Sequence, residues 1–458
     1  MTVDLGGKMK KSELLRHTLI MTAVNLIMRS VGVYFNAYLT SKIGSVGIGL
    51  FQLVMTVYSL AATFSCAGIR LATTRISVEA NTLKKNDITK SLTLCITYAG
   101  ICGSIIGFIL YGFSDFISLY WIDNPQTSFP LKILSLSLPF VAMSSSLGGY
   151  FTAIGRVPHY SCVQLLEQAF KIIVVISLIN KPQFTSPLYF CISIVTGMTA
   201  SEVFSFIMAT MLKKLLRFSK TDKQGITISK IMRIAIPDAI GTCARSILLT
   251  IEHLLIPKGF KKSGTNGDAA LASYGNIHAM AMPVLLYPSA VLTSLSALLI
   301  PNLAEYNELG EKDKIDRTVS RNLKRTLIFS MICASFFFLF STPLCEIIYK
   351  SSEAAKYVKI LSPLVPVMYM DTVTDGMLKG LDQQVYSMRY NIIDSSLCVI
   401  LVWFILPKYS VKGYIFILYI SEILNFALSI NRLRSVCRII FFQARKEENS
   451  KLFRSMKC

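Results

Sequence analysis

Long apolar stretches, separated by short polar segments, recur along the whole of this 458-residue chain. Each stretch reaches the roughly 20 residues that a helix needs to cross the hydrocarbon core of a bilayer. A helix also satisfies its own backbone hydrogen bonds, which lipid cannot do. The pattern predicts an all-α integral membrane protein with about twelve transmembrane helices. The expected spans are residues 17–39, 46–69, 91–113, 130–152, 158–179, 187–212, 231–256, 270–300, 325–348, 357–378, 386–406 and 411–432.

The composition supports the same class of protein. Hydrophobic residues make up 53% of the chain and charged residues only 16%, and the mean hydropathy is +0.53. A soluble globular protein of this length would be far less apolar, so no room remains for a large soluble domain. The cysteines show no metal-binding or disulfide spacing and lie mostly inside the expected spans, where they act as small apolar side chains.

The net charge of +21 is best explained by membrane topology. The basic residues collect in alternate loops rather than in one patch, which does not favour nucleic acid as a partner. By the positive-inside rule these loops are cytoplasmic, and we expect both termini there. The loops on the other side, such as residues 114–125, are expected to be nearly free of Lys and Arg. The basic segments are residues 70–90, 213–233, 312–325 and 432–457.

The order of spans and loops divides the chain into two halves. A basic N-terminal stretch precedes a first span that is too long for a signal peptide, so we expect that span to remain as the first helix. Each half then contains six spans. The expected parts are a cytoplasmic N-terminal segment (1–16), an N-terminal six-helix bundle (17–217), a basic linker (218–230), a C-terminal six-helix bundle (231–432) and a basic cytoplasmic tail (433–458).

Three weak matches indicate that the halves are repeats. Residues 73–83 align with 299–309, and residues 160–171 align with 387–398, which places Glu167 opposite Asp394. A third alignment places Arg29 of the first span opposite Arg245 of the seventh. Any one match could arise by chance between two apolar helices, but three matches in the same order favour a true repeat over chance. Two parallel repeats of six helices are typical of alternating-access transporters.

The first span, TAVNLIMRSVGVYFNAYL, carries a cation near its middle. Arg29 costs roughly 2.5–3.5 kcal/mol at a helix centre on insertion scales, so it should face the bundle interior or a wet cavity. Asn25 and Asn36 fall on the same helical face as Arg29. Because guanidinium groups suit phosphate oxygens, two arginines meeting at the interface of the halves, Arg29 and Arg245, predict a basic central cavity for an anionic substrate.

Other charged residues inside the spans form a possible coupling network. Asp238 and Glu252 lie seven residues to either side of Arg245 on one face of the seventh span. Glu167 and Lys171 are four residues apart and can form an internal ion pair, which favours a structural role. Asp371 has no local partner and is a weak candidate for binding a coupling ion, Na⁺ or H⁺.

Three further residues admit two interpretations each. Arg70 and Arg75 end the second span, where they either anchor the helix at the cytoplasmic surface or form a vestibule that collects an anionic headgroup. His278 could titrate, although a lone histidine in a span is more often a hydrogen-bonded interior residue. The sequence predicts no resident cofactor and no metal centre.

Several segments resemble one family. They are residues 67–80, 144–172, 234–257 and 274–306. They are similar to the stage V sporulation protein B group, which sits among the oligosaccharide flippases of the multidrug/oligosaccharidyl-lipid/polysaccharide superfamily and is related to murein-precursor flippases. The resemblance covers the chain from about residue 15 to about residue 432.

This resemblance implies a substrate and a site. The substrate would be an undecaprenyl-pyrophosphate-linked oligosaccharide, similar to lipid II, moved to the outer leaflet of the bacterial cell membrane by alternating access. Arg29 occupies the place of a cavity arginine in murein-precursor flippases. The chain departs from the family at Gly148, where an arginine is common, and it lacks the helices that many members carry after the twelfth and that form a groove for the lipid tail in murein-precursor flippases.

Two other functions compete with a flippase. The sister branch of the superfamily contains Na⁺- or H⁺-coupled exporters of cationic drugs, which need unpaired cavity carboxylates; Glu252 and Asp371 keep this alternative open. A membrane enzyme would need clustered histidines or carboxylates at a membrane face, and the four histidines are scattered. We therefore expect a monomeric transporter whose partners are the lipid-linked substrate and membrane lipids.

Overall fold

The structure is a computed structural model that describes residues 11–82, 88–180, 187–215 and 227–438. All regular secondary structure within these ranges is helical, which confirms the all-α prediction. Some sequence-based expectations lie outside the described residues. They concern the first ten residues of the N-terminal segment, most of the basic linker, and residues 439–458 of the tail.

The helices of the first half follow the expected spans closely. The N-terminal turns of α5 and α6 carry Pro139 and Pro158, where a missing backbone N–H has no cost. The elements are α1 (Lys11–Cys66), α2 (Ile69–Thr82), α3 (Ile88–Phe116), a π-helix (Ile117–Ile122), a 3₁₀ turn (Pro125–Thr127), α4 (Ser128–Ser135), α5 (Leu138–Ala153), α6 (Val157–Ile179) and α7 (Pro187–Leu215).

The second half repeats this organisation with more broken helices. Ser351 caps α13 by accepting a hydrogen bond from the backbone N–H of Ala354. The elements are α8 (Ile228–Lys262), α9 (Gly267–Gly275), a π-helix (Asn276–Ala281), α10 (Met282–Leu286), α11 (Ser289–Glu308), α12 (Lys312–Tyr349), α13 (Ser352–Leu361), a 3₁₀ turn (Ser362–Leu364), α14 (Val365–Gly380) and α15 (Gln384–Val436).

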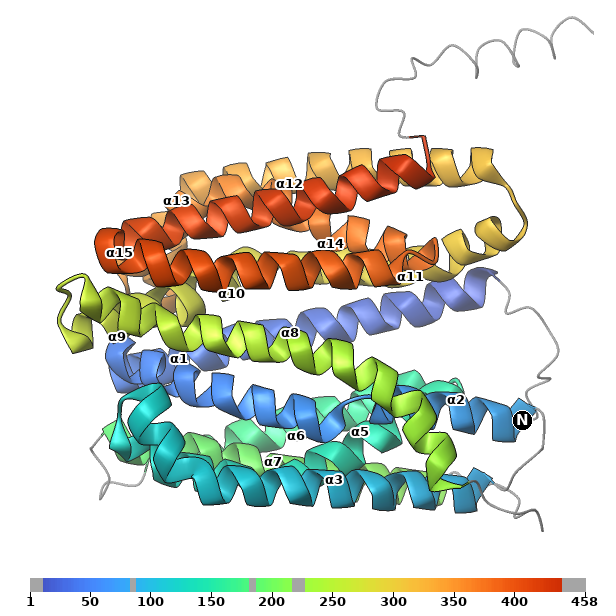
Figure 1. Ribbon diagram of the computed structural model, residues 1–458, viewed down its shortest axis with the longest axis horizontal. Coiled ribbons are helices and arrows are strands. Elements are labelled where there is room, and N and C mark those ends of the chain that lie inside the picture. Colours follow the sequence, from blue (N-terminus) through green and yellow to red (C-terminus); the bar gives the residue numbers. More distant parts are fainter. Residues whose placement is uncertain (1–10, 83–87, 181–186, 216–226, 439–458) are drawn as a thin grey trace, which may run out of the picture.

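Two of the helical segments each account for two expected spans. α1 contains 56 residues and α15 contains 53, well above the roughly 20 needed for one crossing. The backbone leaves the helical region at Gly44 (φ 69°) in α1 and at Ser410 (φ 49°) in α15. Figure 1 shows both segments doubling back on themselves. Across the described residues, eight helices are long and apolar enough to span a membrane, or nine when the bent pair α4 and α5 counts as one.

Several predicted spans differ from the structure. The spans expected at 130–152 and 357–378 are each divided, because α4 ends at Ser135 before α5 begins at Leu138, and a 3₁₀ turn (Ser362–Leu364) separates α13 from α14. The span expected at 270–300 is interrupted by a turn at Tyr287 and Pro288, because the proline cannot continue the hydrogen-bonding of α10. The span expected to begin at residue 325 belongs to a helix that begins at Lys312. The first turns of α12 are rich in Lys and Arg, so hydropathy alone did not include them.

The helices form two bundles with α1 and α8 lying between them (Figure 1). The start of α1, the end of α15 and the connection from α11 to α12 lie together at one end of the molecule, on the right in Figure 1. We call this the basic end, because α2, α8 and α12 bring their clustered Lys and Arg residues to it. The other end contains the breaks in α1 and α15 and is called the opposite end.

The opposite end carries more cations than the sequence analysis expected. The prediction of loops nearly free of Lys and Arg is wrong, because several helix ends and breaks bring lysines there. Two are neutralised locally: Lys261 pairs with Asp123 at 2.7 Å, and Lys132 pairs with Asp115 at 2.9 Å. Lysines at or near breaks and helix ends on this side are Lys42, Lys258, Lys261, Lys262, Lys350, Lys408 and Lys412.

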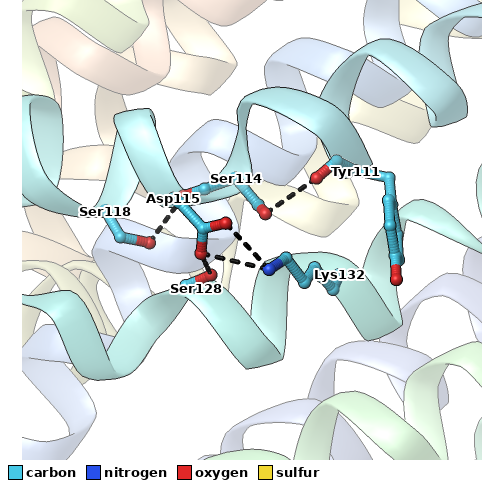
Figure 2. Close-up of polar contacts among 6 residues, drawn as sticks. All are labelled: Tyr111, Ser114, Asp115, Ser118, Ser128 and Lys132. Atoms are coloured by element: carbon cyan, nitrogen blue, oxygen red, sulfur yellow. Dashed lines mark hydrogen bonds and ion pairs between the residues drawn. The ribbon is translucent and has the colours of Figure 1, made fainter.

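The surroundings of Lys132 support the internal repeat. Figure 2 shows its ammonium group between the Asp115 carboxylate and the Tyr111 ring, whose centroid lies 5.9 Å from Nζ. In the second half, Lys359 lies 5.3 Å from the centroid of Phe338. Along the sequence, Lys132 and Lys359 are separated by the same number of residues as Tyr111 and Phe338. The two bundles therefore share a cation–π contact at equivalent positions.

The bundles contact each other at both ends. At the opposite end, α1 and α9 cross so closely that a Cβ on Gly49 would lie 2.2 Å from the carbonyl oxygen of Leu271. At the basic end, Lys230 at the start of α8 forms an ion pair of 2.7 Å with Glu79 at the end of α2. These contacts enclose a space between the two halves of the chain.

Candidate functional site

A cavity of about 500 Å³ lies between the two halves of the chain. Both arms of α1 form one side, α6 and α7 a second, and the broken segment from α10 to α11 closes it from the other half. Helices widely separated in sequence therefore meet around one space. The lining residues are Arg29, Gly32, Val33, Phe35, Asn36, Leu39, Phe51, Gln52, Met55, Gln168, Lys171, Ile194, Met198, Pro283, Leu286, Tyr287 and Ser289.

Arg29 joins the two halves at this cavity. Its Nη1 donates hydrogen bonds to the carbonyl oxygen of Leu286 at 2.7 Å and to Oγ of Ser289 at 2.9 Å. The turn at Tyr287 and Pro288 ends α10, so that a carbonyl at the negative end of a short helix faces the guanidinium. The broken helix that hydropathy did not predict therefore supplies the partners of Arg29.

The guanidinium retains unused donors. An arginine has five N–H donors, and within the described residues the hydrogen bonds of Arg29 involve only Nη1. The side chain is half-buried, so these donors are partly withdrawn from water. Such donors suit the oxygens of a phosphate or carboxylate.

A second cation and several amides face the same cavity. Lys171 comes from α6, and the amides are those of Asn36, Gln52 and Gln168. Among the described residues that line the cavity there is no Asp or Glu. Two cations without a lining carboxylate favour an anion over a cation in this space.

Hydrogen bonds fix the walls beside Arg29. Gln168 donates from Nε2 to the carbonyl oxygen of Met28 at 3.0 Å, which ties α6 to α1. The hydroxyls of Ser30 and Tyr287 lie 2.7 Å apart, which ties α1 to the turn between α10 and α11. The first arm of α1 is thus held by both halves of the chain at the level of its arginine.

Of the two asparagines predicted to share a face with Arg29, only Asn36 has a side chain that the structure describes. Asn36 lines the cavity with Arg29, as their shared helical face predicts. The side chain of Asn25 lies outside the described residues, although its backbone belongs to α1.

Arg245 departs from the expected arrangement. It is not among the residues that line the cavity of Arg29, and its side chain is exposed. It lies within electrostatic reach of the Asp371 and Asp394 carboxylates instead. In this structure the two arginines do not meet: Arg29 bonds to the turn between α10 and α11, whereas Arg245 lies near carboxylates of α14 and α15.

The expected partnership of Glu167 and Lys171 is also looser than predicted. These side chains interact electrostatically, but no ion pair joins them in the part of the chain that the structure describes. Lys171 turns to the cavity, and Glu167 lies near Ser205 and Glu202 inside the first bundle. Spacing four residues apart permits an ion pair but does not require one when another helix offers polar neighbours.

The second bundle holds carboxylates of its own. Asp371 accepts a hydrogen bond from Nδ2 of Asn425 at 3.1 Å, and its other oxygen is buried without a partner among the described residues. Asp394 accepts one from Ser421 at 2.6 Å, and Glu252 is buried nearby on α8. Glu422 of α15 completes this cluster. The described residues contain no group of three or more metal-binding side chains with suitable geometry.

The remaining candidates lie away from the cavity. Nε2 of His278 lies 2.7 Å from the Tyr414 hydroxyl inside the second bundle, as expected of a hydrogen-bonded interior residue. Asp238, Arg70 and Arg75 are exposed, and none lines the cavity. The exposure of the two arginines fits either surface anchoring or a vestibule.

Models of two known protein families match this chain. A family model described as "Polysaccharide biosynthesis protein" matches residues 14–307, well over half of the chain. The chain belongs to the polysaccharide biosynthesis protein family. A second model, MatE, matches residues 263–405. The two models overlap in the region that contains the turn at Tyr287 and Pro288.

Two sporulation proteins of Bacillus subtilis (strain 168) are similar to this family member. Stage V sporulation protein B is 24% identical over 384 residues, covering 82% of this chain and 74% of the relative. Sporulation protein YkvU is 19% identical over 353 residues, covering 74% of this chain and 78% of the relative. The resemblance to the stage V sporulation protein B group is therefore confirmed.

Solved transporters share the fold. The lipid II flippase MurJ in an inward closed conformation superposes with a TM-score of 0.71 at 15% identity, covering 91% of this chain and 87% of that chain. An inward-facing multidrug resistance transporter of the MATE family gives 0.70 at 12% identity, covering 91% and 98%. This polysaccharide biosynthesis family member is thus a multi-pass membrane protein. It shares its fold with transporters of the multidrug/oligosaccharidyl-lipid/polysaccharide (MOP) superfamily.

Proposed function

We propose that this transporter is a flippase for an anionic lipid-linked oligosaccharide, such as an undecaprenyl-pyrophosphate-linked precursor of a cell wall or polysaccharide. The headgroup would occupy the cavity between the two halves, with Arg29 and Lys171 contacting the pyrophosphate and Asn36 contacting polar groups nearby. Asn25 and Arg245 stay in the proposal as further contacts along the path of the headgroup.

One observation carries this proposal: the described lining of the cavity between the halves has two cationic side chains and no carboxylate. A pyrophosphate needs charge-assisted hydrogen bonds to leave water, and a guanidinium with unused donors provides them. The amides and hydroxyls of the lining suit a sugar, which carries many hydroxyl groups. The flippase named among the structural relatives supports the same class of substrate.

Alternating access would move the headgroup past the membrane centre. The ion pair of Lys230 with Glu79 at the basic end and the crossing of α1 with α9 at the opposite end are the contacts that would have to open in turn. We place the basic end in the cytoplasm of a bacterial cell, with both termini there, because the larger clusters of Lys and Arg lie at that end. The transporter would act as a monomer, driven by a gradient of Na⁺ or H⁺.

A second candidate function is an ion-coupled exporter of cationic drugs. The carboxylates of the second bundle favour it, because Asp371 has an oxygen buried without a partner among the described residues. The MatE model covers this part of the chain up to residue 405. Against it, those carboxylates do not line the cavity between the halves, where a cationic drug would have to bind.

Reconstituted liposomes distinguish the two functions. One assay follows translocation of a polyprenyl-pyrophosphate-linked sugar, and a parallel assay follows efflux of a cationic dye. The proposal expects translocation without dye efflux, and it expects Asp371→Asn to change only the dependence on an ion gradient. Dye efflux that is lost in Asp371→Asn, with no lipid translocation by the wild type, would establish the exporter instead.

A further inference from the structure

A second cavity, of about 840 Å³, lies between the first arm of α1 and α12. Most of its lining is apolar, and the exposed side chains of Ile332, Phe336 and Ile347 contribute to it. We call it the α1–α12 groove. Its lining residues are Ser30, Val33, Tyr34, Ala37, Tyr38, Ser41, Val284, Tyr287, Pro288, Ile332, Cys333, Phe336, Phe337, Leu344, Ile347, Ile348, Tyr349 and Lys350.

The groove adjoins the cavity of Arg29. Val33 and Tyr287 line both spaces, and the hydrogen bond between Ser30 and Tyr287 stands where they meet. Ser30 directly follows Arg29 in α1, so this boundary is one residue from the cation. A single molecule with an anionic group at Arg29 therefore has an apolar space beside it.

The groove extends in one direction only. From Ser30 it follows α1 to Ser41, a rise of roughly 16 Å at 1.5 Å per residue, which is about half the hydrocarbon thickness of a bilayer. It ends beside Lys350, at the C-terminal end of α12 and close to the break in α1 at Gly44. The groove thus covers one leaflet, the one at the opposite end of the molecule.

The geometry points to a second part of the same binding site: the α1–α12 groove holds the hydrocarbon chain of the lipid whose anionic headgroup binds at Arg29. This inference rests on the proposed flippase function. Because the surrounding lipid is as apolar as the groove, the groove adds little affinity for the chain. Its effect is to keep the chain in apolar surroundings while the headgroup is inside the protein, and to direct the chain into the leaflet at the opposite end.

Photo-crosslinking tests which molecule occupies the groove. The probe is a polyprenyl-pyrophosphate-linked sugar with a diazirine in its chain, and the comparison probe is a phospholipid with a diazirine in an acyl chain. We expect the first probe to label residues 332–350 of α12 at least tenfold more than the second, and we expect unlabelled polyprenyl substrate to abolish the labelling. Equal labelling by both probes would overturn the inference, because the groove would then be ordinary lipid-facing surface.

Filling the groove tests its role in transport. Ile332→Trp places a larger side chain in the groove, whereas Leu339→Trp places one on the exposed surface of the same helix outside it. We expect the first substitution to lower translocation of the long-chain substrate at least tenfold and the second to leave it within twofold. Ile347→Trp repeats the test at the far end of the groove, and size-exclusion profiles establish that each variant folds. Equal translocation by the groove variants and Leu339→Trp would contradict the inference.

A short-chain probe separates this inference from the proposed function. Geranyl pyrophosphate is too short to fill the groove but carries the same anionic group. We expect it to bind wild type and Ile332→Trp equally and to bind Arg29→Ala at least tenfold more weakly. The short-chain probe could bind in an Arg29-dependent way while Ile332→Trp and Ile347→Trp translocate the long-chain substrate normally. That result would overturn the role of the groove but would agree with the proposed flippase function. No binding of the short-chain probe to wild type would refute the headgroup site itself.

Discussion

Arg29 in the first helix donates a hydrogen bond of 2.9 Å to the hydroxyl of Ser289, 260 residues later in the chain. This bond crosses from the first half of the protein to the second, at the edge of the cavity between them. An arginine near the middle of a membrane-spanning helix needs such partners, because an unpaired cation would be costly there. Arg29 is thus the residue that makes the first span unfavourable in the membrane by sequence alone, and it connects the two halves in the structure.

The crossing of α1 and α9 should not tolerate a side chain. Gly49→Ala would place a Cβ 2.2 Å from the carbonyl oxygen of Leu271, so the helices must separate. We expect a loss of about 1–3 kcal/mol in the free energy of unfolding, as for other overpacked sites. Thermal unfolding in detergent measures this.

Gly112→Ala in α3 is the matched control for that substitution, because a Cβ there would meet no atom within 4 Å. We expect it to be neutral or to stabilise the helix by up to about 1 kcal/mol. Similar melting temperatures for the two alanine variants would mean that α1 and α9 are less tightly packed than the structure has them.

The ion pair of Lys230 with Glu79 should hold the basic end closed. It lies beside an apolar cluster in which Cys95 is 1% exposed and contacts the first turns of α8. We expect Lys230→Ala to raise the rate of maleimide labelling of Cys95 severalfold in a variant that retains only this cysteine. Both side chains are partly exposed, so the effect on stability should stay below about 1 kcal/mol.

The charge-reversed pair supplies the control. Glu79→Lys combined with Lys230→Glu should restore slow labelling of Cys95, whereas either reversal alone should not. Unchanged labelling in Lys230→Ala would show that the pair does not control opening at this end.

Lys171 should contribute to binding of the anionic headgroup. Lys171→Gln removes the charge and keeps a polar side chain, so we expect geranyl pyrophosphate to bind about tenfold more weakly, or about 1.4 kcal/mol. Isothermal titration in detergent measures the affinity. Lys408→Gln, which lies far from the cavity at the break in α15, should have no effect. If both variants lost affinity equally, general surface charge rather than the cavity would be the cause.

The transmembrane organisation could be predicted because apolar runs determine it directly. Each expected span has a helical counterpart, and two of the differences have clear local causes: Pro288 breaks one helix, and the basic first turns of α12 continue another beyond its apolar part. The repeat could have been argued more strongly from KILS, which occurs at residues 132–135 and again at 359–362. Both lysines contact an aromatic ring in the structure.

The site could be predicted only in part. The sequence was sufficient to predict that Arg29 is a cation inside a span and that it shares a helical face with Asn36. The separation of Arg245 from Arg29 was not predictable, because it depends on how α1, α8, α11 and α15 pack against one another. The role of Lys171 in the lining was missed for a similar reason, since the sequence offered Glu167 as a sufficient partner. The α1–α12 groove joins residues about 300 positions apart, and no local pattern marks it.

Translocation of a polyprenyl-pyrophosphate-linked sugar by liposomes containing Arg29→Ala, Arg29→Lys or wild-type protein tests the central claim most directly. The guanidinium contacts both the opposite half and, in this account, the headgroup. We predict that Arg29→Ala lowers the rate at least tenfold and that Arg29→Lys restores only part of it, because an ammonium group keeps the charge but lacks the planar fork. Translocation by Arg29→Ala at the wild-type rate, with the protein equally folded, would contradict the account.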